Sequence, residues 1–236
     1  MSDSRVVIVT GARRGLGRTI SEHLLGQGFH VVGCGRKPVE WEAEGFTYLQ
    51  ADVTDLADVR RLVKTARDSG HEVYGVVNNA ATASMNHSLL TPASSVTDML
   101  GTSVGASFLV SREAVKVMRK NTRGRIVGLS SVAVPLRLEG QAGYVAAKAG
   151  LEGLCQVMAK EFAPFGVTVN VIGATPIDTD MIRGVPKDTI AKLVDQFPIK
   201  RLGLRRDVTN ALDFFLRPES DAVTGQVLYL GGVPNG

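Results

Sequence analysis

The sequence has few of the features that mark secreted, membrane-spanning or fibrous proteins. Its two cysteines, Cys34 and Cys155, lie far apart and no signal-peptide pattern precedes them, so we expect no disulfide framework and a reducing, cytoplasmic location. No apolar run reaches the roughly 18 to 20 residues that a membrane-spanning helix needs. No internal repeat, low-complexity tract or linker divides the chain. We therefore expect one soluble domain over residues 1–236 and no membrane partner.

Concentrated charge is also missing. The formal net charge is +4, but the basic residues are mostly dispersed, and small clusters such as Arg13-Arg14, Arg36-Lys37 and Arg205-Arg206 are only pairs. Nucleic-acid binding requires basic residues gathered on one face or along one element. We therefore expect no nucleic-acid partner, and we identify no set of metal ligands.

Two hydrophobic patterns alternate along the chain. Short β-branched runs predict strands at residues 5–10, 29–34, 46–49, 73–77, 125–129, 167–172 and 226–230. Between them, apolar residues at helical spacing predict helices at residues 16–27, 56–68, 97–119, 144–162 and 207–216. Strands that alternate with helices and are apolar on both faces predict an α/β protein, a doubly wound, three-layer Rossmann fold with a seven-stranded parallel sheet.

One long stretch shows neither pattern. Residues 174–200 contain Pro176, Pro186 and Pro198 and have no clear periodicity. Long irregular segments in compact domains are often functional lids. We interpret this stretch as a lid over the substrate.

A glycine-rich turn follows the first predicted strand. Residues 10–17 read TGARRGLG and open the first helix, where backbone N–H groups and the helix dipole favour a pyrophosphate. A structural turn is the alternative, since a glycine-rich turn alone is a weak signal. We predict a cofactor-binding turn, whose contacts are Gly11, Arg13, Arg14, Gly15, Leu16 and Gly17.

The end of the second strand indicates which dinucleotide binds. An NAD-binding protein places a carboxylate there for the ribose hydroxyls, whereas this chain has Gly35 followed by Arg36. Arg36 and Arg14 can both approach a 2′-phosphate that a carboxylate would repel. The alternative is that both are ordinary surface charges. We predict NADP(H) as the cofactor.

Three residues form a candidate catalytic set. Tyr144 and Lys148, in YVAAK, are four apart at the start of a predicted helix and so share one face. Ser131 directly follows the predicted strand RIVGLS. A tyrosine with a lysine four residues on occurs often by chance, but the ordered set of three is far rarer.

Together these motifs resemble a known family. With ADV at residues 51–53, NNA at 78–80 and IDTDM from Ile177, the chain resembles the short-chain dehydrogenase/reductase family over its whole length. It is most similar in appearance to the 3-oxoacyl-acyl-carrier-protein reductases of that family.

The resemblance implies a role for each motif. Tyr144 would give a proton to a substrate carbonyl as the cofactor gives hydride, and Ser131 would hydrogen-bond that oxygen. Lys148 would lower the pKa of the tyrosine and hold the nicotinamide ribose. The other cofactor contacts that the resemblance implies are Asp52, Val53, Asn79, Ala80, Ile177 and Thr179.

One departure from the family pattern affects the chemistry. Ser103 stands where the family has a fourth catalytic residue, an asparagine that positions a water beside the lysine. A serine hydroxyl can also bind water, so we include Ser103 among the candidate catalytic residues.

The resemblance also implies partners. The substrate would be a 3-oxoacyl thioester or related β-keto compound, free or carrier-bound, and Lys120, Arg123 and Arg125 form half of the basic docking signature for a carrier protein. The alternatives are a reductase of a free ketone, quinone or sugar, and a catalytically silent NADP-binding regulatory protein. We expect a homo-oligomer, a tetramer or dimer, formed by helices 103–119 and 144–162 through positions such as Ala147, Leu151 and Leu154.

Overall fold

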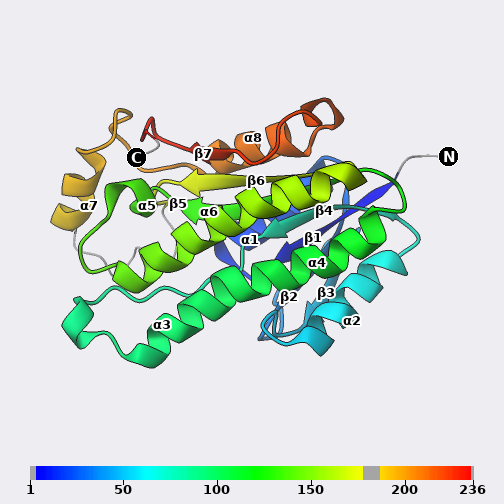
Figure 1. The fold of residues 1–236 in the computed structure, drawn as a ribbon, viewed down its shortest axis with the longest axis horizontal. Coiled ribbons are helices and arrows are strands. Elements are labelled where there is room, and N and C mark those ends of the chain that lie inside the picture. Colours follow the sequence, from blue (N-terminus) through cyan, green and yellow to red (C-terminus); the bar gives the residue numbers. More distant parts are fainter. Residues whose placement is uncertain (1–3, 178–186, 235–236) are drawn as a thin grey trace.

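A computed structural model describes residues 4–177 and 187–234 of the chain, and its centre is a parallel sheet (Figure 1). Every pairing between neighbouring strands is parallel, and the strand order is β3-β2-β1-β4-β5-β6-β7. This order confirms the predicted seven-stranded, doubly wound sheet. The strands are β1 (Arg5–Thr10), β2 (His30–Gly35), β3 (Phe46–Gln50), β4 (Glu72–Asn78), β5 (Gly124–Ser131), β6 (Val167–Ala174) and β7 (Val227–Tyr229).

Helices cover both faces of the sheet. On one face lie α2 (Leu56–Arg67), α4 (Ala106–Met118) and α6 (Ala142–Phe162), and on the other lie α1 (Gly15–Gly26) and α8 (Arg205–Leu216). Two clusters of buried side chains, one on each face, make the core. Figure 1 shows α4 and α6 crossing in front of the sheet, with the arrowhead of β6 directed toward α5 (Ala133–Leu136) and α7 (Lys187–Val194). The carboxyl edge of the sheet therefore lies on the α5 and α7 side.

The predicted helix at residues 97–119 proves to be three consecutive helical segments. These are α3 (Ala93–Leu100), the π-helical turn η2 (Gly101–Gly105) and α4. π-Helical turns are rare and often lie at functional sites. α3 packs on the start of α6 at Gly143, where an added Cβ would lie 2.6 Å from Met99 Cε. Ser103 lies inside the π-helical turn.

The expectation of an irregular stretch over residues 174–200 is wrong in part. Residues 187–194 form α7, because Leu193 and Val194 pack against a small cluster of Val132, Phe197 and Val233 near the carboxyl edge. The short helices η1 (Ser88–Leu90), η3 (Ala163–Phe165) and η4 (Pro218–Ser220) complete the helical elements of the described chain. Thr179 lies outside the described residues, so its predicted cofactor contact stays a prediction.

The residues named for the subunit interface are a second correction. Ala147 and Leu151 are buried within this chain, and Leu151 and the partly buried Leu154 pack in the core cluster on this face of the sheet. Large apolar side chains that do reach the surface of α3, α4 and α6 are Leu100, Phe108 and Val157. No helix within residues 4–177 and 187–234 is long and apolar enough to cross a membrane.

Candidate active site and cofactor cleft

In the glycine-rich turn between β1 and α1, backbone segments lie so close together that glycine is required. Gly11 and Gly15 have φ values of +69° and +57°, a region that favours glycine. A Cβ on Gly17 would collide with the carbonyl oxygen of Gly11, so this close contact also requires glycine. By contrast, a Cβ on Gly15 would meet nothing within 4 Å. The turn is therefore tight on its inner side and open where the first helix begins.

Residues from the end of β4 hold this turn. Asn79 Nδ2 donates to the carbonyl oxygen of Thr10 at 2.9 Å, and the backbone N–H groups of Asn79 and Ala80 donate to Thr10 Oγ1 at 3.0 and 2.9 Å. The sequence predicted that Asn79 and Ala80 line the cleft. The structure brings both to the turn, where they fix the loop around Gly11.

A side chain at Gly35, at the carboxyl end of β2, would crowd the hydroxyl of Tyr48. A Cβ there would lie 2.7 Å from the Tyr48 hydroxyl and 3.8 Å from Arg13 Cβ. Arg13 is anchored through its carbonyl oxygen, which accepts a hydrogen bond of 3.2 Å from Trp41 Nε1. Thus Arg13, Gly35 and Tyr48 adjoin one another at the place where an adenosine ribose is expected.

Arg36 and Asp52 lie near each other at the ends of β2 and β3. The pKa of Asp52 lies below its usual value. The main cause is a hydrogen bond from the backbone N–H of Thr54, and the charge of Arg36 acts in the same direction. The Asp52 carboxylate also accepts from the Thr54 hydroxyl at 2.7 Å, and Val53 is buried. Leu16 packs with the core under the turn, and Ile177 is buried beside Gly203.

These residues fit a dinucleotide. The open side of Gly15 lies at the start of α1, whose first N–H groups favour a pyrophosphate. Arg36, at the end of β2, and Arg14, directly before α1, are exposed and bring positive charge, and Gly35 brings no carboxylate. The residues at this edge therefore fit a dinucleotide cofactor.

Ser131, Tyr144 and Lys148 come together at the carboxyl end of β5. A hydrogen bond links the Tyr144 and Ser131 side chains, and Ser131 Oγ accepts from the backbone of Ala133. Lys148 Nζ lies 5.8 Å from the centroid of the Tyr144 ring and donates to the carbonyl oxygen of Leu129 at 2.6 Å. The lysine side chain is buried, with 3% of the residue exposed. One helical turn and one strand end thus present a hydroxyl, a phenol and an amine together.

The electrostatics of this trio differ from the expectation in one respect. Burial raises the pKa of Tyr144, and its hydrogen bond with Ser131 only partly opposes that rise. Burial also lowers the pKa of Lys148 to about 8, with Glu152 acting in the opposite direction. The pKa of Tyr144 is thus raised overall, because desolvation dominates at both groups, and the lowering effect expected of Lys148 stays a prediction.

Ser103 is buried close to this site. The π-helical turn that contains it packs against α6, and Ser103 Oγ has no hydrogen-bond partner in the described part of the chain. The Ser103 carbonyl oxygen accepts from Ser107 Oγ at 2.6 Å. A buried hydroxyl without a partner is uncommon and indicates a site for an additional polar group.

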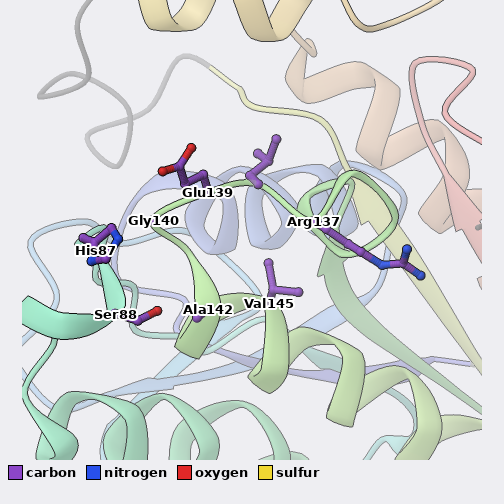
Figure 2. Close-up of a pocket in the computed structure, with 8 residues that line it drawn as sticks. His87, Ser88, Arg137, Glu139, Gly140, Ala142 and Val145 are labelled. Carbon is purple, nitrogen blue, oxygen red and sulfur yellow. The ribbon is translucent and has the colours of Figure 1, made fainter.

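A pocket of about 300 Å³ adjoins the turn of α6 that holds Tyr144. Ala142 and Val145 form its floor, and its rim comes from the segment around η1 and from the loop before α6 (Figure 2). In Figure 2, His87 and Glu139 lie on one side of the pocket, and Arg137 extends to the other. The sequence did not single out these rim residues, because no motif marks them.

The fold and the residues at the carboxyl edge of the sheet together define a class of protein. A doubly wound sheet with a glycine-rich turn after β1, and a serine, tyrosine and lysine at the end of β5, define a dinucleotide-binding oxidoreductase. Over residues 11–232 the chain matches the family described as enoyl-(acyl carrier protein) reductase. The chain belongs to the short-chain dehydrogenase/reductase family, which confirms the resemblance.

Named relatives cover nearly all of the chain. It is 33% identical to the 3-oxoacyl-acyl-carrier-protein reductases of Escherichia coli (strain K12) and Salmonella typhimurium, over 98% of this chain and 97% of each relative. A solved structure, a provisionally assigned gluconate dehydrogenase from Agrobacterium tumefaciens, matches with a TM-score of 0.88 and 28% identity. That match covers 97% of this chain and 94% of the other.

Three polar residues of the site were missed at the level of sequence. Glu152 lies one helical turn beyond Lys148 and accepts hydrogen bonds from Ser130 Oγ and from the Tyr229 hydroxyl. The four-residue spacing of Tyr144, Lys148 and Glu152 along α6 was a readable signal. No local signal could place Tyr229, which is 77 residues away from Glu152.

Proposed function

We propose that this oxidoreductase reduces a ketone to an alcohol with NADPH. The observation that carries the proposal is the position of Ser131, Tyr144 and Lys148 at the carboxyl edge of the sheet, the edge where the glycine-rich turn also lies, with a pocket against the turn of α6 that holds Tyr144. A regulatory protein without catalysis would not need a proton donor at this place.

The chain's own residues handle the proton. The raised pKa of Tyr144 keeps the phenol protonated at neutral pH, so its hydroxyl can donate to the oxygen of a bound carbonyl. The Ser131 hydroxyl donates a second hydrogen bond to that oxygen and stabilises developing negative charge. Lys148 orients the site from behind the tyrosine ring. NADPH, when bound, supplies the hydride.

The preference for NADPH rests on the end of β2. Arg14 and Arg36 would hold the 2′-phosphate, and Gly11, Gly15 and Gly17 would hold the pyrophosphate. A side chain at position 35 would require the Tyr48 hydroxyl to move, because a Cβ there would lie 2.7 Å from it. NADH lacks the phosphate that these arginines suit.

For the substrate, we favour a 3-oxoacyl thioester or related β-keto compound. The support is the names of the 33% identical relatives, which are 3-oxoacyl-acyl-carrier-protein reductases. The basic residues expected to dock a carrier support it less. Arg125 is buried and donates to the Gly124 and Pro218 carbonyl oxygens, and Arg123 pairs with Glu72, so the docking role predicted for Arg125 is wrong.

A second candidate is a small hydroxylated ketone, such as a sugar derivative. The rim of the pocket contains His87, Ser88, Arg137 and Glu139, whose side chains suit hydroxyl groups better than an acyl chain. The similar solved structure is assigned as a gluconate dehydrogenase, which agrees with this lining.

One assay separates these candidates. Oxidation of NADPH and of NADH is followed with acetoacetyl thioesters, free sugars, quinones and simple ketones as substrates. We expect turnover with NADPH and the thioester to have the highest kcat/KM. A higher kcat/KM with a sugar would replace the first candidate by the second, and no turnover with any carbonyl compound would contradict reductase activity.

We also propose a homo-oligomer, formed on the exposed apolar side of α3, α4 and α6. Phe108 and Val157 are exposed there although they are large and apolar, and Arg112 stacks on the Phe108 ring. Light scattering at micromolar concentration is expected to give the mass of a dimer or tetramer. A monomeric mass would contradict this proposal.

A further inference from the structure

Lys148 places an ammonium group in the protein interior, where a charge is energetically unfavourable. Its side chain is buried, and its ammonium group donates a hydrogen bond to the backbone carbonyl oxygen of Leu129. Moving an ammonium ion from water into a protein interior costs several kcal/mol unless charge and hydrogen bonds offset it. Any group that keeps Lys148 charged therefore matters to the site.

Among the described residues around Lys148, one acidic side chain acts on it. On α6, Tyr144 lies on one side and Glu152 on the other, and the electrostatic effect of Glu152 raises the pKa of Lys148. Cys155 lies further along α6 and has a raised pKa, so it is a neutral thiol. The neighbouring elements contribute the hydroxyls of Ser130 and Ser131 from β5, of Ser103 from η2 and of Tyr229 from β7.

Glu152 is itself held in place from two other elements. Ser130 Oγ on β5 donates to Oε1, and the Tyr229 hydroxyl on β7 donates to Oε2 at 2.8 Å. Both hydrogen bonds favour the charged carboxylate, against the effect of burial, which raises the pKa of Glu152. A charged acceptor with one donor on each oxygen has little freedom to turn, so the carboxylate is held in place one helical turn along α6 from Lys148.

The backbone of β6 makes room for this arrangement. Tyr229 pairs with Gly173 across the β6–β7 ladder, and a Cβ on Gly173 would collide with the Tyr229 ring. Glycine at this position lets the ring lie over β6 and its hydroxyl reach α6. Residues of three elements thus converge on one carboxylate that takes no part in the proposed proton transfer.

We propose that Glu152 is a positioning residue: held by Ser130 and Tyr229, its carboxylate supplies the counter-charge that keeps the buried Lys148 an ammonium ion. Its effect on turnover rests on the proposed reductase function, but its effect on the protonation of Lys148 does not. Without the carboxylate, a larger fraction of Lys148 is neutral near neutral pH. A neutral amine carries no positive charge that could stabilise negative charge beside Tyr144. It also has fewer N–H groups with which to donate hydrogen bonds there.

The direct test is a pH titration of Lys148 by NMR in protein labelled at the lysine Cε carbon. The Lys148 signal is identified by its loss in Lys148→Met. We expect a midpoint near 8 in the parent, since burial lowers the pKa of Lys148 to about 8. In Glu152→Gln the midpoint falls by about 0.5 to 1 pH unit, because a nearby negative charge is lost.

The chain offers a matched control. Glu161 lies on the same helix and is exposed, so Glu161→Gln makes the same change of charge without contact with the site. Its midpoint is expected to equal that of the parent. A Glu152→Gln midpoint equal to or above that of the parent, in folded protein, would overturn the proposal.

A conservative variant keeps the test decisive if Glu152→Gln does not fold. Glu152→Asp retains the charge but draws it back from its two donors, so its midpoint is expected to fall by about 0.2 to 0.5 pH unit. An unchanged midpoint in Glu152→Asp would also overturn the proposal.

In the reductase assay, the pH at which kcat falls on the alkaline side is expected to move down with the NMR midpoint, while KM for the carbonyl compound is unchanged. If the parent reduces no carbonyl compound, the proposed function fails and the NMR midpoints still decide the role of Glu152.

Discussion

Two pairs of a tyrosine and a buried cation lie near opposite ends of the central sheet. At the carboxyl end, Lys148 Nζ lies 5.8 Å from the Tyr144 ring; toward the amino end, Arg125 Cζ lies 5.8 Å from the Tyr74 ring. Both cationic residues are 3% exposed. Burial raises the pKa of both tyrosines. Similar chemistry therefore occurs twice in one fold.

The two pairs differ in what their polar atoms bind. Tyr74 donates its hydroxyl to the Leu216 carbonyl oxygen at 2.5 Å, and the Arg125 guanidinium donates to the carbonyl oxygens of Gly124 and Pro218. Backbone carbonyls fix these groups permanently, and arginine does not lose its proton. Tyr144 instead interacts with the hydroxyl of Ser131. Lys148 also donates to a backbone carbonyl oxygen, that of Leu129, but burial lowers its pKa to about 8, so it can lose its proton. A site for chemistry needs groups that can exchange protons, whereas a structural clamp needs groups that cannot.

The largest expected effect comes from removing one hydroxyl at the carboxyl end. Tyr144→Phe is expected to lower kcat by about 10² to 10⁴, because it deletes the proton donor and keeps the ring. The melting temperature and the affinity for NADPH are expected to stay near those of the parent. The matched variant Tyr74→Phe removes the other buried hydroxyl and is expected to leave kcat unchanged. Full activity in Tyr144→Phe would contradict the assignment.

Arg125→Met tests the structural member of the other pair. The methionine fills much of the space of the arginine stem but leaves the Pro218 carbonyl oxygen without its donor, so we expect a loss of about 2 kcal/mol in the free energy of unfolding. Urea denaturation measures this loss, and kcat is expected to be unchanged. A fall in kcat without a loss of stability would break the distinction between the two ends.

Arg36→Asp asks whether an exposed cation at the carboxyl edge also has a function. We expect the ratio of kcat/KM for NADPH to that for NADH to fall by about 10- to 100-fold, since one charge-assisted contact with the 2′-phosphate is replaced by repulsion. Lys37→Asp, at the neighbouring exposed position, is the control and is expected to change the ratio less. Equal kcat/KM with both cofactors in the parent protein would contradict the role of Arg36.

The smallest effect is expected at Ser103. Its buried hydroxyl, which lacks a partner in the described chain, can hold a water that returns protons toward Lys148. We expect Ser103→Ala to lower kcat about threefold to tenfold with KM unchanged, and Ser103→Asn to retain activity. Steady-state kinetics of the two variants distinguish them. Equal turnover of Ser103→Ala and the parent would show that the hydroxyl has no part in catalysis.

The parts of the molecule that follow local rules were predictable from the sequence. β-Branched runs and helical periodicity placed all seven strands, and the turn around Gly11 and the trio of Ser131, Tyr144 and Lys148 were recognised from short motifs. Arg125 was misread as a docking residue, because sequence alone does not reveal that β5 buries it beside Pro218. The Glu152 network escaped for the same reason: only the adjacency of β6 and β7 brings Tyr229 to α6.

The π-helical turn η2 has a consequence for the angular phase of the long helical segment. Each residue of an α-helix advances the side-chain direction by about 100°, and a π-turn holds one residue more than the α-turn it replaces. Deleting one residue from Gly101–Gly105 would restore continuous phase and rotate α3 by about that angle relative to α4. Met99 and Val96 would then leave the notch that Gly143 keeps open for them at the start of α6. The extra residue thus acts as a phase adjuster, which lets α4 face the sheet while α3 faces the helix of the catalytic tyrosine.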